Sequence, residues 1–215
     1  MGNTKRKIWL FDFDGTLVDS MPVYGSLMLR ILEEHGVAYP DDILKIITPL
    51  GFLGTAKYFR GMGLEKSEQE LVDLMTMYAT NEYTNNVPAK KNVIEVLRKL
   101  KENGDRLNVL TASPHTSLDP CLKRLGIFDL FENVWSCDDF KTTKADPEIY
   151  RLASKRLGVK PKDVIFLDDN LNADKTAKQA GMVVYGVYDD TSKEYVNEMK
   201  NVTDRYIYDF IELLG

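Results

Sequence analysis

The chain has 215 residues and a formal net charge of −5, with 44% hydrophobic and 28% charged residues. These values are typical of an ordinary globular protein, either one domain or a core with a small accessory domain. Because no basic stripe offsets the acidic balance and no apolar run is long enough to cross a bilayer, we expect neither nucleic acid nor membrane as a partner. The two cysteines suggest no disulfide framework, so a cytoplasmic location is expected.

The first predicted element is a strand at residues 8–11, which is apolar at every position. Such a run suits a strand that is buried on both faces of a parallel sheet. Asp12 and Asp14 follow it directly, ahead of a Gly-Thr turn. Since charged groups are seldom placed deep in a sheet, we expect both carboxylates at the carboxyl edge, where open parallel sheets bind ligands. An acidic surface loop is the alternative, but the preceding run is too apolar for a surface strand.

The next part of the chain carries helical patterns and no convincing strand. Apolar residues recur at helical spacing in residues 24–32 and again in residues 71–78. We therefore expect an all-helical insert at residues 17–85, between the two parts of a core made of residues 1–16 and 86–215. Extra helices packed onto a single domain are the alternative.

Strand and helix patterns alternate through the remainder of the chain. Apolar runs are followed by amphipathic stretches with proline near their starts or glycine near their ends. This alternation predicts an α/β fold, a doubly wound, Rossmann-like parallel sheet with right-handed crossovers and helices on both faces. The expected strands lie at 107–110, 134–136, 164–167 and 182–187, and the expected helices near 93–100, 118–125, 146–157 and 173–180.

Three of the predicted strands end in polar or charged residues. Because the carboxyl ends of parallel strands share one edge, these residues should converge on a single site. Several carboxylates cannot stay ionised together without a cation, and a set of oxygen donors suits Mg²⁺ best. Asp168 and Asp169, which end the strand at 164–167, could instead cap the following helix. The polar endings are Asp12 and Asp14, Thr111 and Ser113, and Asp168 and Asp169.

These motifs carry a resemblance to a known family. The string DFDGTLVDS at residues 12–20 resembles the first motif of the haloacid dehalogenase superfamily, in the branch of β-phosphoglucomutase and phosphoglycolate phosphatase. Thr111, Lys144 within KADPEIY, and the acidic pair at 168–169 match the other three motifs in order. The resemblance spans nearly the whole chain. It implies that the helical insert is a cap, or lid.

The resemblance also implies an activity, which is Mg²⁺-dependent hydrolysis of a small phosphorylated metabolite. Asp12 would be the nucleophile that forms an aspartyl-phosphate. Asp14 would protonate the leaving oxygen and then deprotonate the attacking water. Haloacid dehalogenation is disfavoured, because it does not need the second aspartate.

The implied metal ligands are carboxylates of the same edge. Asp12 would supply a carboxylate oxygen and Asp14 its main-chain carbonyl. Asp168 and Asp169 are both expected as the remaining ligands, whereas Asp174 is a weaker candidate further along the chain.

The transferred phosphoryl group must be held by donors. The resemblance assigns this role to the Thr111 hydroxyl, the turn through Ala112 and Ser113, and the Lys144 ammonium. The turn could instead be only a helix cap. Lys141 competes with Lys144 but lacks the Asp-Pro-Glu-Ile-Tyr context.

Two other functions stay open. A phosphomutase would use the same residues, although Phe52 falls near the place of the cap arginine that grips phosphate in the mutase. A catalytically silent member of the family would bind a phosphorylated ligand without turnover, but this chain has lost neither motif aspartate nor Lys144.

Lys57 and Arg60 could meet a substrate anion or belong to a solvated helix face. We expect a monomer or a dimer.

Overall fold

The computed structural model describes residues 6–47 and 50–215. The segment Thr48-Pro49-Leu50-Gly51 is typical in sequence of a break between shorter elements, and its first two residues lie outside the described residues. The chain divides into two compact units, one made of Met1–Asp19 and Pro88–Gly215, the other of Ser20–Val87. No helix in the described ranges is both long enough and apolar enough to cross a membrane.

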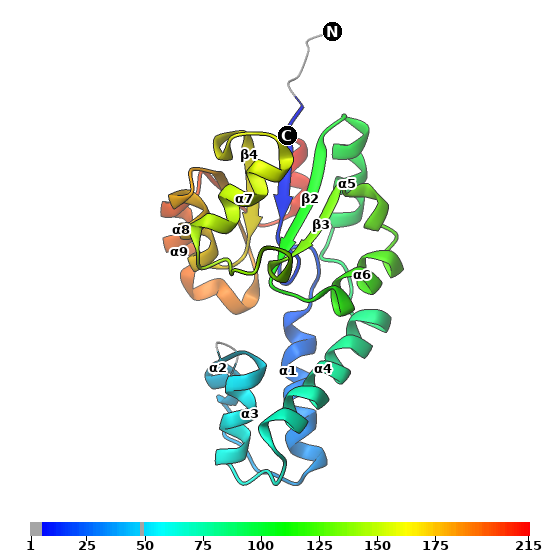
Figure 1. Cartoon of the computed structure of the whole chain (residues 1–215), viewed down its shortest axis with the longest axis vertical. Coiled ribbons are helices and arrows are strands. Elements are labelled where there is room, and N and C mark those ends of the chain that lie inside the picture. The colour runs from blue at the N-terminus through cyan, green and yellow to red at the C-terminus, as the bar shows by residue number, and fades with distance from the viewer. Residues whose placement is uncertain (1–5, 48–49) are drawn as a thin grey trace. The chain divides into compact units, whose positions relative to one another are not determined.

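The larger unit is built on a six-stranded sheet in the order β3-β2-β1-β4-β5-β6, and every neighbouring pair is parallel. Figure 1 shows β1, in blue, between β2 and β4. This arrangement confirms the predicted α/β class. The strands are β1 (Ile8–Phe11), β2 (Arg106–Thr111), β3 (Asn133–Ser136), β4 (Val164–Asp168), β5 (Val183–Val187) and β6 (Arg205–Ile207).

Helices cover both faces of this sheet. Successive residues of a strand point to opposite faces, and β1 shows the alternation. Ile8 and Leu10 join a core cluster with α7 (Pro147–Leu157) and α8 (Leu171–Gln179). On the other face Phe11 stacks on Phe210, with ring centroids 6.2 Å apart. The strand that precedes Asp12 is therefore buried on both sides, which explains its apolar sequence.

The other helices of this unit are close to their expected positions. Their ends differ from expectation by a few residues, as is common where terminal turns fray. They are α5 (Val93–Glu102) and α6 (His115–Arg124). The structure also contains the helix α9 (Val196–Val202) and the short 3₁₀ turns η2 (Phe128–Leu130), η3 (Cys137–Phe140), η4 (Pro161–Asp163), η5 (Asp190–Tyr195) and η6 (Phe210–Leu214). No element was expected after residue 187, so η5, α9, β6 and η6 are additions made by the structure.

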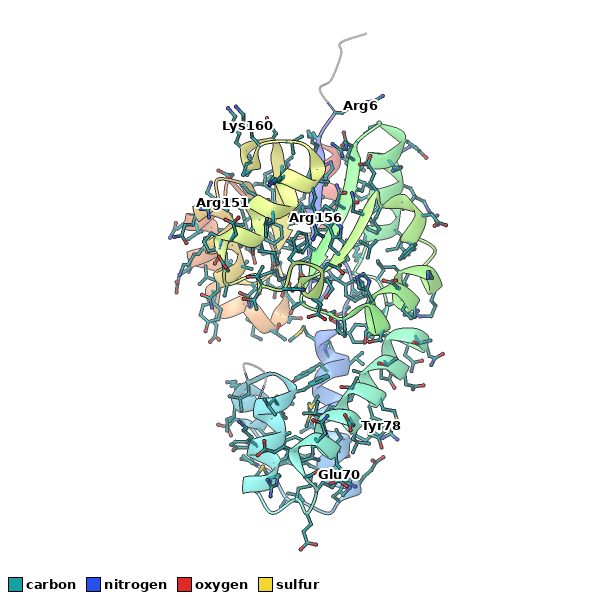
Figure 2. The ribbon with its side chains drawn as sticks, in the orientation of Figure 1. Arg6, Glu70, Tyr78, Arg151, Arg156 and Lys160 are labelled. Carbon is teal, nitrogen blue, oxygen red and sulfur yellow. The ribbon has the colours of Figure 1, made fainter. Side chains whose placement is uncertain are left out.

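The smaller unit is helical, and no strand lies among its described residues. Apolar faces of its helices form a separate core cluster. Ser67 and Glu70 form a reciprocal capping box at the start of α4, where Figure 2 labels Glu70. The helices are α1 (Met21–Glu34), α2 (Ile43–Ile47), α3 (Gly51–Gly61) and α4 (Glu68–Asn85).

The boundaries of the two units differ from the expected 17–85. The helical unit begins at Ser20 and ends at Val87. Val18 forms bridges with Asp14 and with Ala89, which ties it to the larger unit. Sequence periodicity marks where helices start, but it carries no signal for these isolated bridges.

Candidate active site

Three buried carboxylates gather at the carboxyl edge of the sheet. The Asp12 amide donates to the Leu167 carbonyl at 2.8 Å, which extends the pairing of β1 and β4 past the end of β1. One carboxylate oxygen from each of Asp12, Asp168 and Asp169 can be chosen so that all three lie within 4.8 Å of one another. The side chains predicted to converge from β1 and β4 are thus brought together.

Lys144 reaches this cluster from the loop ahead of α7. Its Nζ donates to Asp12 Oδ1 at 2.6 Å and to Asp168 Oδ2 at 2.8 Å, and its side chain is 16% exposed. The competing Lys141 is exposed and lies at the end of η3 with φ of 55°. Of the two lysines considered in the sequence, the structure places Lys144 on the acidic cluster.

The β2 end contributes hydroxyl groups to the same edge. The Thr111 side chain is buried and its hydroxyl accepts a hydrogen bond from the Ser113 amide at 3.1 Å. The Ser113 hydroxyl donates to Asp14 Oδ2 at 2.5 Å. Ser113 was expected only to line a phosphate-binding turn with Ala112, and its bond to Asp14 had no signal in the sequence. The exposed Ala112 lies between them.

Burial and mutual repulsion perturb the charges of this cluster. Burial raises the pKa of Asp12 well above its ordinary value, and the nearby Asp168 raises it further. Burial and Asp168 likewise raise the pKa of Asp169 to about 7. Burial disfavours the charge on Lys144, but Asp12 and Asp168 outweigh it and hold the pKa of the ammonium well above its usual range. The three carboxylates of the cluster thus outnumber its one ammonium group.

The donor chemistry of the cluster fits a hard divalent cation. The three converging side chains offer only carboxylate oxygens, which are the preferred ligands of Mg²⁺. A bound cation would also offset the repulsion among Asp12, Asp168 and Asp169. The residues present therefore fit the expected metal.

The turn that follows Asp14 packs against Asp169 and holds its carboxylate in place. The Thr16 hydroxyl donates to Asp169 Oδ1 at 3.0 Å. Gly15 has φ of +71°, and a Cβ built there would lie 2.4 Å from Asp169 Oδ2. Only glycine allows this close approach, because any side chain would collide with the carboxylate. Neither Gly15 nor Thr16 was expected to contact Asp169.

The acidic pair is not used to cap α8. Asn170 is the N-cap, and its side chain accepts from the amides of Asn172 and Ala173 at 2.9 and 3.2 Å. Asp168 instead accepts from the Asn170 amide at 2.8 Å and from Lys144. The alternative of a purely capping role for the pair therefore does not hold.

Asp174 lies apart from the converging carboxylates. It is fully buried in the first turn of α8, and its two carboxylate oxygens have no hydrogen-bond partner among the described residues. Burial raises its pKa well above the ordinary value, and the nearby Asp168 raises it further. It is not one of the three carboxylates that form the candidate metal group.

The candidate residues of the helical unit are on its surface. Lys57 and Arg60 are both exposed on α3, and Arg60 lies 3.6 Å from Glu68. Phe52 is part of the interior instead, since its ring stacks on Tyr24 with centroids 6.2 Å apart.

Comparisons with known proteins agree with this geometry. The family model of haloacid dehalogenase-like hydrolases matches residues 7–181. The pyrophosphatase PpaX of Bacillus velezensis is 32% identical over 180 residues, which are 83% of this chain and 81% of PpaX.

Solved structures share the fold over nearly the whole chain. A predicted phosphoglycolate phosphatase from Haemophilus somnus superposes with a TM-score of 0.83 at 24% identity, covering 99% of this chain and 98% of the other. The β-phosphoglucomutase of Clostridium difficile gives 0.73 at 18% identity, covering 97% and 93%. At these identities the likeness shows the fold. The family match and the curated relatives, PpaX among them, confirm the predicted superfamily and the phosphatase class of enzyme. The chain belongs to the haloacid dehalogenase-like hydrolases.

Proposed function

We propose that this enzyme hydrolyses a phosphate monoester of a small metabolite, with Mg²⁺ as its cofactor and an aspartyl-phosphate on Asp12 as its intermediate. The observation that carries the proposal is the position of Asp12. Its carboxylate lies at the end of the central strand, within a set of three converging carboxylates and 2.6 Å from the Lys144 ammonium.

In the first half-reaction a carboxylate oxygen of Asp12 attacks the phosphorus atom. The bond from phosphorus to the ester oxygen breaks, and that oxygen takes a proton from Asp14 as it leaves. Ser113 supports this role because its hydroxyl, 2.5 Å from Asp14 Oδ2, fixes the orientation of the carboxyl.

In the second half-reaction Asp14 acts as a base. It removes a proton from a water molecule, whose oxygen attacks the phosphorus atom and breaks the bond to Asp12. Inorganic phosphate leaves, and Asp12 and Asp14 return to their starting states. Two displacements of this kind replace one more difficult displacement by water.

Charge on the phosphoryl oxygens must be offset during both steps. Lys144 is placed to do so because it already contacts the nucleophile. The Thr111 hydroxyl and the turn through Ala112 and Ser113 are proposed to hold further phosphoryl oxygens. Asp12, Asp168 and Asp169, with the main-chain carbonyl of Asp14, would hold Mg²⁺. The ion would supply positive charge next to the transferred group.

The geometry of the site supports a phosphorylated substrate. All the groups named above act on the phosphoryl end of the substrate. The helical unit is the proposed cap, with the task of recognising the rest of the molecule. The relatives agree on phosphate chemistry, since they include a pyrophosphatase and a predicted phosphoglycolate phosphatase.

A screen of substrates tests this function. Release of inorganic phosphate would be measured for sugar phosphates, phosphoglycolate, nucleotides and pyrophosphate, each with Mg²⁺ and with EDTA. We expect Mg²⁺-dependent release from at least one monoester. Release that is equal in EDTA would contradict the metal assignment. A product that is an isomeric sugar phosphate, formed without free phosphate, would show a phosphomutase instead. Binding of a phosphorylated ligand without turnover would show a silent member.

A further inference from the structure

Lys90 lies where the chain returns from the helical unit to the larger unit. The two crossings of the chain pair with each other at this point. The Asp19 amide donates to the Pro88 carbonyl at 2.9 Å, and the Lys90 amide donates to the Leu17 carbonyl at 3.0 Å. Val18 and Ala89 form the antiparallel bridge between these bonds. The main chain of Lys90 is therefore fixed beside the motif that carries Asp12 and Asp14.

The side chain of Lys90 joins three segments that are distant in sequence. Its Nζ donates to the Gly15 carbonyl at 2.6 Å, to the Tyr188 carbonyl at 2.7 Å and to Asp189 Oδ2 at 3.0 Å. An ammonium group has three protons, so these three acceptors satisfy it completely. Lys90 thus links its own segment to the turn after Asp14 and to the loop after β5.

The surroundings of Lys90 are unlike those of a surface lysine. Its side chain is 19% exposed and that of Asp189 is 5% exposed. Asp189 is itself held in place by the amide and the hydroxyl of Thr191, at 2.9 and 2.6 Å. The neighbouring Lys91 has a side chain that is 83% exposed, with one ion pair to Asp209 at 3.3 Å. Ordering a long side chain costs entropy, so three bonds in a shielded position indicate a specific role.

The contact with Gly15 leads directly to the acidic cluster. Gly15 packs so closely on Asp169 that a Cβ would lie 2.4 Å from its carboxylate, and the next residue, Thr16, donates to that carboxylate at 3.0 Å. The Gly15-Thr16 turn is therefore the surface against which Asp169 rests. Lys90 binds the carbonyl of that turn and limits its movement.

We propose that Lys90 is a positioning residue that holds the Gly15-Thr16 turn against Asp169, and that it thereby sets the affinity of the site for Mg²⁺. This inference rests on the proposed function only for the identity of the ion. Residues that orient metal ligands typically change metal affinity by about 10–100-fold when they are replaced.

The direction of the change in Mg²⁺ affinity on replacing Lys90 distinguishes a positioning role from an effect of its charge alone. Lys90 carries a positive charge near a cation site, so removing that charge alone would tighten Mg²⁺ binding. Loss of positioning would weaken it. In Lys90→Met the stem is retained and all three bonds are lost. We expect its dissociation constant for Mg²⁺ to rise by about tenfold.

Titration calorimetry with Mg²⁺ on the metal-stripped full chain measures this constant without turnover. Lys91→Met is the matched control, since it makes the same change one residue away on an exposed side chain, and its constant should equal that of the wild type. The rise in melting temperature on adding Mg²⁺ gives a second readout, which should shrink in Lys90→Met and not in Lys91→Met. Unchanged or tighter Mg²⁺ binding by folded Lys90→Met would overturn the proposal.

Asp189→Asn keeps the test decisive if Lys90→Met does not fold. It weakens one of the three bonds of the ammonium and leaves the two carbonyl bonds, so Mg²⁺ should bind a few-fold more weakly. Wild-type affinity in this variant, with Lys90→Met unfolded, would assign Lys90 to stability alone and overturn the proposal.

The hydrolysis screen is read separately. A wild-type chain that binds Mg²⁺ but hydrolyses nothing would contradict the proposed function. The role of Lys90 would then still be decided by the calorimetry on its variants. A wild-type chain that binds no Mg²⁺ would overturn the role of Lys90.

Discussion

The ion pairs at the candidate active site differ in burial from the ion pairs of the helical unit. In the larger unit, Asp12, Lys144 and Asp168 are buried together and each has at least one close partner of opposite charge. In the helical unit, Arg30 pairs with Glu34 and Arg60 with Glu68, and these four side chains are 37–56% exposed. Exposed pairs contribute little to stability, whereas a buried charge that loses its partner is costly. The contrast shows where substitution should be felt most.

The largest effect is expected at the nucleophile. Asp12→Asn keeps the shape of the side chain but cannot form an acyl phosphate, so turnover of any active phosphate monoester should fall to the background rate. Phosphate release under saturating Mg²⁺ measures it. A substantial fraction of wild-type activity in this variant would show that another residue is the nucleophile.

The next effect concerns the proton transfers. Asp14→Asn removes the proposed acid and base and should slow turnover by about 10²–10⁴-fold. Ser113→Ala removes the hydroxyl that donates to Asp14 Oδ2, so it should cause a smaller loss in the same direction. Steady-state kinetics on one substrate compare the two variants. A Ser113→Ala loss equal to that of Asp14→Asn would argue that the hydroxyl has a role of its own.

The third prediction concerns pH in the metal-free protein. The folded pKa of Asp169, about 7, is raised above the ordinary value of an aspartate, so the folded state binds the proton more tightly than the unfolded state. The stability that this proton gives is complete at low pH and is lost as the pH rises through about 7.

Thermal unfolding with EDTA at pH 5 and pH 8 tests this sign. Relative to Asp169→Asn, the wild type should lose stability between these values, by at most about 1.4 kcal/mol per pH unit. Added Mg²⁺ should reduce the difference, because the ion favours the ionised carboxylate. A wild type that gains stability relative to the variant at higher pH would contradict the raised pKa.

A local change in the helical unit should cost stability without affecting the chemistry. Ser67→Ala removes the hydroxyl that accepts from the Glu70 amide at the start of α4. The expected loss is about 1 kcal/mol of unfolding free energy. Denaturant unfolding measures it, and turnover of p-nitrophenyl phosphate by the folded variant should stay at the wild-type level.

The smallest effect is expected for an exposed ion pair. Arg60 and Glu68 lie 3.6 Å apart with side chains 52% and 37% exposed. Arg60→Gln should therefore change the unfolding free energy by about 0.5 kcal/mol or less. A loss of unfolding free energy as large as that of Ser67→Ala would show that this exposed pair contributes more to stability than its exposure indicates. It would also weaken the contrast between buried and exposed pairs.

The sequence predicted the parts of the fold that depend on local pattern. The apolar run at β1, the strand–helix alternation and the acidic end of β4 were all legible, because periodicity and burial leave a trace in residue type. β6 was missed because three residues, Arg205–Ile207, are too few to show a period. The helical unit, Ser20–Val87, begins and ends within a few residues of the expected 17–85.

The candidate site was predictable to a lesser degree. The motif aspartates and Lys144 could be named from their sequence context, but only the structure shows the contacts of Lys144 with Asp12 and Asp168. Lys144 and Lys141 lie in the same loop, and only their neighbouring residues distinguish them in the sequence. The role of Lys90 could not be inferred at all, since two of its three partners are main-chain carbonyls, at Gly15 and Tyr188. Main-chain atoms are the same in every residue, so no residue type marks them.

The central position of β1 has a consequence for the order in which the chain can fold during synthesis. β1 is translated before its two neighbours in the sheet, β2 and β4, which begin at Arg106 and Val164. The helical unit, Ser20–Val87, forms its own core cluster from residues that emerge in between. Contacts between distant segments form more slowly than local ones. The nascent chain therefore carries the apolar β1 without either of its sheet neighbours until β2 has been translated, and β1 is covered on both edges only after β4 has been translated.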